Sequence, residues 1–217
     1  MLKDGKAAGI VPDVVLATAE RVGHSGEANF TLPILRSLEM AKEQPNTFVY
    51  LTATPDHQPD YTMVFCFLKD RMGGVWKKTR SWKSFDTMPK TSIFGFILGS
   101  PAPELLATMG FSNFSPVRMS VQNVEKLIAD RIDVWMAYSS AQHYFLQQFG
   151  QKSEDFVFSR PLVTTDVCLA TSKATSPEVV AKWRNAFKSI VADGTYNAIR
   201  QRYLSYFPWS ENPLPDQ

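Results

Sequence analysis

Apolar residues along the chain fall into short continuous runs and longer stretches with helical spacing. The stretch that follows Val11, PDVVLATAERV, has proline at its start and Gly23 just past its end, a combination that predicts a helix. A short, partly alternating strand is predicted at Asn29–Leu32. Pro33 opens a second predicted helix that Pro45 ends. Its apolar stripe consists of Ile34, Leu35, Leu38 and Ala41.

The run TFVYLTA, residues 47–53, has no polar alternation and is therefore predicted to be a strand buried on both faces. Further elements are predicted in the order strand 73–80, strand 92–99, helix 103–109, strand 115–119, helix 121–130, strand 131–137 and helix 141–150. Alternation of strands and helices favours a parallel sheet built from βαβ units. The chain then continues with a helix over 177–193, capped by Ser176, a helix from Thr195 to about residue 206, and an extended, proline-rich tail.

Size and charge narrow the class of protein. The 217 residues suffice for one large domain or two lobes, each with a core. The formal net charge is 23 − 21 = +2, and the one basic cluster, at residues 77–83, is interpreted as a solvated rim, so no nucleic-acid partner is expected. The longest apolar run, residues 93–98, is far shorter than the roughly 20 residues that span a bilayer, and no membrane insertion is expected.

The two cysteines, Cys66 and Cys168, allow at most one disulfide. Together with only three dispersed histidines they do not make a four-ligand zinc site, so no metal and no cofactor are expected. The favoured interpretation is a pair of buried thiols, and a bridge in an oxidising compartment is the alternative.

Four stretches together resemble one known family. They are GIVPDVV, TATPDHQPDY, FGFILGSPAPELLATMGF, and DRIDVWMA with VVAKWRNAFKSIVADGTYNAIRQRYL. The chain is similar over nearly its whole length to the type II periplasmic solute-binding proteins, specifically the group that delivers polar amino acids to ABC importers.

The resemblance implies an α/β fold of two Rossmann-like lobes joined by two crossover strands. Lobe 1 would comprise residues 1–66 and 168–217, lobe 2 residues 72–162, and the crossovers residues 67–71 and 163–167. It also implies a non-catalytic, periplasmic, monomeric protein that binds a small-molecule solute between its lobes and presents it to an ABC transporter membrane permease. In the family a central strand of lobe 1 precedes the segment that matches Asp4-Gly5, so the chain is expected to be an N-terminally truncated member.

The same resemblance places the candidate ligand contacts. The residues it assigns to the solute site are Tyr50, Thr52, His57, Phe67, Gly99, Ser100, Trp135, Tyr138 and Asp166. His57 stands where the family has an arginine that clamps a ligand carboxylate, and Tyr138 stands where the family has an aspartate that pairs with the ligand ammonium. Pro101 and Pro103 each remove a backbone N–H from the anion-binding turn at Gly99–Ser100. The expected solute is therefore small and polar or aromatic, and free amino acids are expected to bind weakly.

Five of the nine candidates have a plainer interpretation. His57 suits a solvated turn, Trp135 and Tyr138 suit a lobe core, Ser100 suits a helix cap, and Asp166 suits a solvated hinge. Two other functions also remain open. One is a degenerate sensory or partner-binding module, and the other is a lyase or dehydratase that uses His57 with Asp56 or Asp60, or uses Glu104.

Overall fold

A computed structural model of the chain describes residues 2–3, 6–7, 9–24, 32–54, 57 and 59–203. The chain divides into two compact units, unit 1 with residues 1–69 and 165–217, and unit 2 with residues 70–164. Two strands, β4 (Tyr61–Lys77) and β8 (Val163–Ser172), contain the points where the chain passes from one unit to the other. No helix in the described part of the chain is both long and apolar enough to cross a bilayer.

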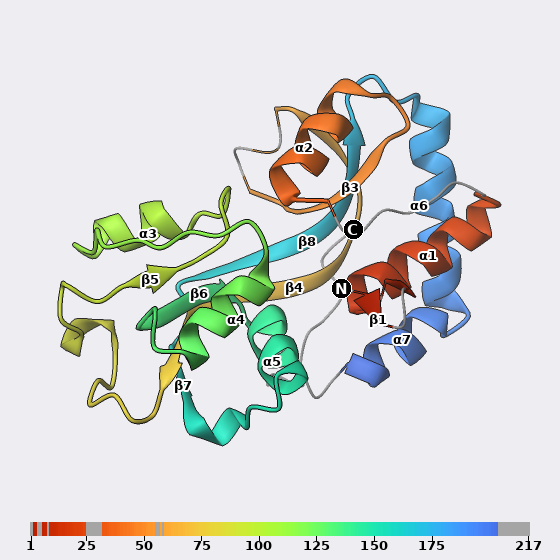
Figure 1. Cartoon of the computed structure of the whole chain (residues 1–217). Helices are drawn as coiled ribbons and strands as arrows, with labels where there is room; N and C mark the ends of the chain where they lie inside the picture. The colour runs from red at the N-terminus through yellow and green to blue at the C-terminus, as the bar shows by residue number, and fades with distance from the viewer. Residues whose placement is uncertain are drawn as a thin grey trace. The chain divides into compact units, whose positions relative to one another are not determined.

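Unit 1 contains both strands and helices (Figure 1). Its remaining elements are β1 (Leu2–Lys3), β2 (Lys6–Ala7), α1 (Ile10–Val22), α2 (Ile34–Glu43), β3 (Phe48–Thr52), α6 (Pro177–Ala192) and α7 (Thr195–Tyr203). The strand order here is β3–β8–β4, and β3 runs antiparallel to β8 with Thr52 opposite Val167. β1 and β2 form a separate antiparallel pair.

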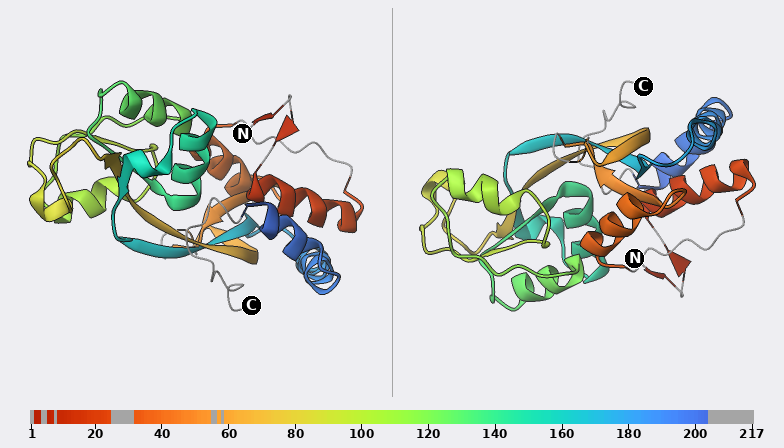
Figure 2. Two further views of the ribbon diagram at one scale, coloured as in Figure 1. Left: turned by 90° about the horizontal axis from the view of Figure 1, so that it is seen from below. Right: turned by 90° about the horizontal axis from the view of Figure 1, so that it is seen from above.

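The core of unit 1 lies where α1, α6 and α7 pack against β4 and β8. In both views of Figure 2, α6 is seen nearly end-on and lies next to α1, which it contacts. Val14 and Ile190 are fully buried in this cluster, and Phe65 stacks on Phe187 with their ring centroids 4.1 Å apart. A smaller apolar cluster joins α2 to β3 through Ala41, Val49 and Leu51.

The helices of unit 1 lie where the sequence predicts them, although α1 begins at Ile10, two residues before Pro12. Gly23 ends α1 in the left-handed conformation with a φ of 70°, a backbone region that glycine enters without steric cost. The Ser176 hydroxyl accepts a hydrogen bond from Val179 N–H at 3.4 Å and caps α6. The predicted helices over this unit are confirmed.

Unit 2 is a second α/β body. Its remaining elements are the 3₁₀ turn Phe85–Thr87, β5 (Phe94–Gly95), α3 (Ala102–Thr108), α4 (Ser120–Ile128), β6 (Val134–Tyr138), α5 (Ser139–Gln148), the 3₁₀ turn Ser153–Asp155 and β7 (Phe156–Phe158). β4 pairs with β6 on one side and β7 on the other, and β6 pairs with β5. Trp76 is buried in an apolar cluster with α3, and Trp135 is buried in another with α4 and α5.

The α/β fold class is confirmed, but the expected parallel sheet is wrong for most pairings. β5 and β6 form a parallel ladder, while β3–β8, β4–β6 and β4–β7 are antiparallel. The reason is that β4 and β8 connect the two units and run against their neighbours, an arrangement that a simple βαβ alternation does not contain.

Three strand predictions need correction. β3 is not buried on both faces, because Val49 and Leu51 face the α2 cluster while Tyr50 is 41% exposed. The strand predicted over 92–99 is reduced to Phe94–Gly95, and the one over 115–119 is reduced to isolated bridges at Phe114 and Val117. β7 was not predicted at all.

Cys66 and Cys168 form a disulfide between β4 and β8 within unit 1. The favoured expectation of two free thiols is therefore wrong, because the pairing of β4 with β8 brings the two side chains together.

Some predictions lie outside the described residues. These are the strand residues 29–31, the candidate base partner Asp56, the end of the last helix beyond Tyr203, and the tail 207–217.

Candidate functional site

Three of the unit 1 candidates, Tyr50, Thr52 and His57, lie on β3 or in the loop that follows it. Thr52 is the last residue of the strand, and its backbone carbonyl lies 2.7 Å from His57 Nδ1. Nδ1 is also 3.2 Å from the Thr54 hydroxyl. A carbonyl oxygen only accepts hydrogen bonds, so Nδ1 carries the proton in this contact. In the neutral ring Nε2 is then the acceptor nitrogen.

Backbone contacts on the other side of His57 hold this loop in shape. The His57 carbonyl accepts hydrogen bonds from Asp60 N–H at 3.2 Å and Tyr61 N–H at 3.1 Å. The Tyr61 ring meets the imidazole edge-on, with centroids 6.0 Å apart. The Asp60 carboxylate is paired with Lys42 of α2 at 2.8 Å. His57 is therefore held by several contacts, a more ordered position than the solvated turn residue considered above.

The other candidates in unit 1 divide into exposed and buried residues. Tyr50 lies on β3 with much of its side chain exposed. Asp166 lies on β8, and its carboxylate is 3.3 Å from Lys69 Nζ, so its charge has a neighbouring counter-ion. Phe67, in contrast, is completely buried among the residues of the unit 1 core, and its carbonyl accepts a hydrogen bond from the Tyr196 hydroxyl. We therefore leave Phe67 out of the proposed contacts.

In unit 2 the turn at Gly99–Ser100 follows β5. Gly99 has a φ of 83°, which favours glycine, and Ser100 N–H donates to the Ile97 carbonyl at 3.1 Å. Ser100 is not the helix cap that the alternative interpretation predicts, because Pro101 precedes α3 and no side chain caps it. The Ser100 hydroxyl is shielded from solvent and has no hydrogen-bond partner among the described residues.

Trp135 and Tyr138 both belong to β6 but have different environments. Trp135 is completely buried beneath α4 and α5, as the core interpretation predicts, so we also leave it out of the proposed contacts. Tyr138 is half-buried at the end of β6, opposite Met72 of β4, and packs against the apolar cluster on the α3 side.

Asp70, on β4, is a buried acid that the sequence analysis did not single out. It is 2% exposed, and its Oδ1 accepts hydrogen bonds from the Ser139 hydroxyl at 2.8 Å and from Arg71 N–H at 2.7 Å. Its Oδ2 accepts a hydrogen bond from the Ser140 hydroxyl. Burial raises the pKa of this carboxyl above its usual value, although these hydrogen bonds oppose the shift.

The contacts of Asp70 tie β4 to the first turn of α5, directly after Tyr138. The signal that marks this residue is an aspartate within the apolar strand sequence FCFLKDRMGGV. An acid in such a strand must find donors when it is buried.

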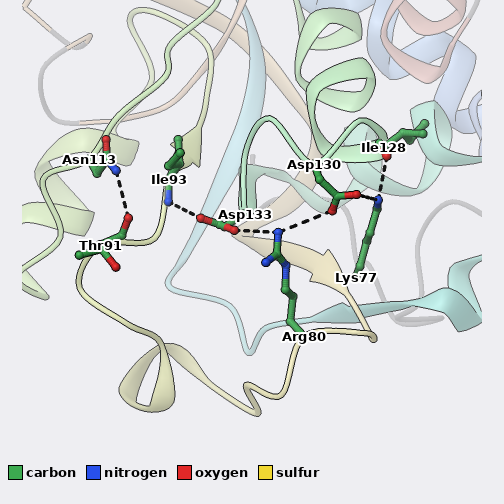
Figure 3. Close-up of polar contacts among 8 residues, drawn as sticks. All are labelled: Lys77, Arg80, Thr91, Ile93, Asn113, Ile128, Asp130 and Asp133. Atoms are coloured by element: carbon green, nitrogen blue, oxygen red, sulfur yellow. Dashed lines mark hydrogen bonds and ion pairs between the residues drawn. The ribbon is translucent and has the colours of Figure 1, made fainter.

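Two of the four basic residues in the cluster at residues 77–83, Lys77 and Arg80, are paired with acids, as Figure 3 shows. Lys77 Nζ lies 2.7 Å from the Asp130 carboxylate and 2.7 Å from the Ile128 carbonyl at the end of α4. Arg80 lies 2.9 Å from Asp133, which also accepts a hydrogen bond from Ile93 N–H at 2.8 Å. These ion pairs connect the end of β4 and the residue Arg80 beyond it to the end of α4 and to the residues before β5 and β6.

Comparisons with solved structures give strong matches in fold. One is an ABC uptake transporter substrate-binding protein from Streptococcus pneumoniae with bound histidine, with a TM-score of 0.81 and 21% identity over 99% of this chain and 88% of that chain. Another is an ancestral arginine-binding protein bound to glutamine, with a TM-score of 0.80 and 16% identity over 94% of this chain and 91% of the other.

The chain has the fold of the type II periplasmic solute-binding proteins. This confirms the fold inferred from the four sequence stretches. A histidine kinase sensor domain with similarity to periplasmic binding proteins shares the fold as well, with a TM-score of 0.79 and 14% identity over 99% of this chain and 91% of that chain. No family model and no curated protein matches the chain.

Proposed function

We propose that the chain is a non-catalytic, extracytoplasmic solute-binding protein that serves an ABC importer, with units 1 and 2 acting as its two lobes. It binds a small polar or aromatic solute. Its contacts are Tyr50, Thr52, His57 and Asp166 in unit 1 and Gly99, Ser100 and Tyr138 in unit 2. The observation that carries the proposal is the match in fold to amino-acid-binding proteins over nearly the whole chain.

The disulfide supports an extracytoplasmic location. Disulfides such as Cys66–Cys168 persist in oxidising compartments and are rare in the cytosol, where reducing systems keep thiols free. The same location suits a protein that collects a solute for import.

The altered contacts support a solute other than a free amino acid. Loss of an arginine clamp at His57 and of an aspartate at Tyr138 removes charge-assisted hydrogen bonds worth roughly 1.5–3 kcal/mol each. Two such losses lower the affinity for an amino-acid zwitterion by several orders of magnitude. We therefore expect the solute to carry less charge than a free amino acid.

The contacts of His57 favour binding over catalysis. A histidine base is usually oriented by an acidic partner or hydrogen-bonded to a nucleophile that it activates. Among the described residues, the partners of His57 Nδ1 are a backbone carbonyl and the Thr54 hydroxyl, and neither is a carboxylate. A sensory module is the second candidate function, and it is supported by the fold that the chain shares with a histidine kinase sensor domain.

A thermal-shift screen over amino acids, amines, amides, sugars, carboxylates and aromatic metabolites tests the proposal, because a ligand stabilises the folded state that it binds. We expect a saturable rise in melting temperature with one class of solute and no chemical conversion of that solute. A screen without any shift would favour the partner-binding sensory module, and turnover of a solute would favour an enzyme.

A further inference from the structure

The imidazole of His57 has a fixed orientation and therefore distinct roles for its two nitrogens. Nδ1 faces the Thr52 carbonyl at 2.7 Å, a distance at which an N–H must lie between the two atoms. The protonated nitrogen of the neutral ring is thus Nδ1. Nε2 then holds a lone pair and accepts hydrogen bonds.

The surrounding groups do not change this assignment. The Thr54 hydroxyl, 3.2 Å from Nδ1, lies on the same side of the ring as the Thr52 carbonyl. The Tyr61 ring meets the imidazole edge-on. Among the described residues near His57, Asp60 is charged and donates its backbone N–H to the His57 carbonyl, and its carboxylate is engaged by Lys42 at 2.8 Å.

We infer that His57 selects solutes that present a hydrogen-bond donor, such as a primary amide, and disfavours solutes that present a carboxylate at the same position. The inference rests on the proposed function, because it assumes that the loop after β3 contacts the solute. A donor N–H or O–H pairs with the lone pair of Nε2. A carboxylate oxygen would instead place a second acceptor against it, and both groups would lose hydrogen bonds that water supplies.

The tautomer is measured without any ligand. Nitrogen-15 NMR of the full chain, labelled at histidine, reports which ring nitrogen carries the proton at neutral pH. The chain has three histidines, and the His57 signals are the ones that disappear in His57→Asn. We expect the proton on Nδ1. A proton on Nε2 would overturn the inference whatever the chain binds.

Solute choice is measured with matched pairs that differ only in the group of interest. The probes are nicotinamide against nicotinate, indole-3-acetamide against indole-3-acetate, and benzamide against benzoate. We expect the amide of at least one pair to raise the melting temperature more than its acid, and to bind roughly fivefold to tenfold more weakly to His57→Asn, the effect of one lost hydrogen bond.

Two variants separate the roles of the nitrogens. Asparagine places an N–H near the Nδ1 position and has no group at Nε2, whereas glutamine places its amide group near Nε2. We therefore expect His57→Gln to retain more of the preference for amides than His57→Asn.

Each outcome of the solute experiment decides a separate claim. Stronger binding of the acids would overturn the inference and leave the solute-binding function standing. Equal binding within every pair would do the same. If no solute of any class shifts the melting temperature, both the proposed preference for donor solutes and the proposed solute-binding function are contradicted.

Discussion

The disulfide between Cys66 and Cys168 joins the strand by which the chain leaves unit 1 to the strand by which it returns. The two cysteines are 102 residues apart in sequence, so all of unit 2, residues 70–164, lies within the loop that this bond closes. Both residues belong to unit 1, where the bond holds β4 and β8 together.

Because this loop is long, the bond is expected to stabilise the fold strongly. Closing a loop of about 100 residues restricts the unfolded chain, and removing such a bond from a protein costs about 2–5 kcal/mol. We predict that reductant lowers the urea midpoint of the wild-type chain. The double variant Cys66→Ala/Cys168→Ala should unfold at the lower midpoint with or without reductant.

Mass spectrometry supplies the control for this prediction. The mass of the unfolded, unreduced chain should rise by two hydrogens on reduction. A chain whose mass and urea midpoint do not respond to reductant would show that the bond is absent.

Much of the fold follows from local sequence signals. Proline at the start and glycine past the end locate α1, and the Ser176 cap with Pro177 locates α6, because these residues satisfy or end the backbone hydrogen bonds of a helix. Strand direction was not predictable in this way. The sequence pattern of a strand such as β4 is the same whether its neighbour runs parallel or antiparallel. The direction of pairing depends on contacts that are distant in sequence.

The candidate site was predicted less completely than the fold. His57 was proposed as a contact because its loop resembles a family segment, yet the contact to the Thr52 carbonyl that orients its ring could not be predicted from the sequence. Asp70 was missed because its partners, Ser139 and Ser140, lie about 70 residues away. Phe67 was included among the candidate contacts because it is aromatic, but an aromatic residue in a strand fits a core equally well, and its side chain lies in the unit 1 core.

Asp70 provides a prediction about pH. Because burial raises the pKa of this carboxyl, the folded chain holds its proton more tightly than the unfolded chain does. The stabilisation that this proton gives is fully present below the unfolded pKa, near 3.8, and is lost as pH rises through the raised pKa of the folded state. Asparagine has nearly the same shape as aspartate and carries no charge. The Asp70→Asn variant should therefore not lose this stability as pH rises.

We therefore predict that Asp70→Asn equals the wild type in unfolding free energy at low pH and exceeds it at neutral pH. Asp70→Ala is the matched variant. It leaves the Ser139 and Ser140 donors without their acceptor, so it should be less stable than Asp70→Asn by about 1–3 kcal/mol at all pH values. Urea unfolding across the pH range measures both, and an Asp70→Asn chain that is less stable than the wild type at neutral pH would contradict the account.

Phe67 tests the assignment of core against solute contact. Its side chain is completely buried, so Phe67→Ala should lower the unfolding free energy by about 3–5 kcal/mol. The milder variant Phe67→Leu should reduce stability without changing the affinity for whichever solute the thermal screen identifies. A Phe67→Leu chain of normal stability that no longer binds that solute would return Phe67 to the site.

The central claim is that the chain binds a small solute with contacts that no longer suit free amino acids. Calorimetric titration of the purified chain with each of the twenty amino acids, and with the solute found in the thermal screen, tests this most directly. The account predicts saturable one-to-one binding of the screened solute and no micromolar binding of any amino acid. Micromolar binding of even one of the twenty would contradict it.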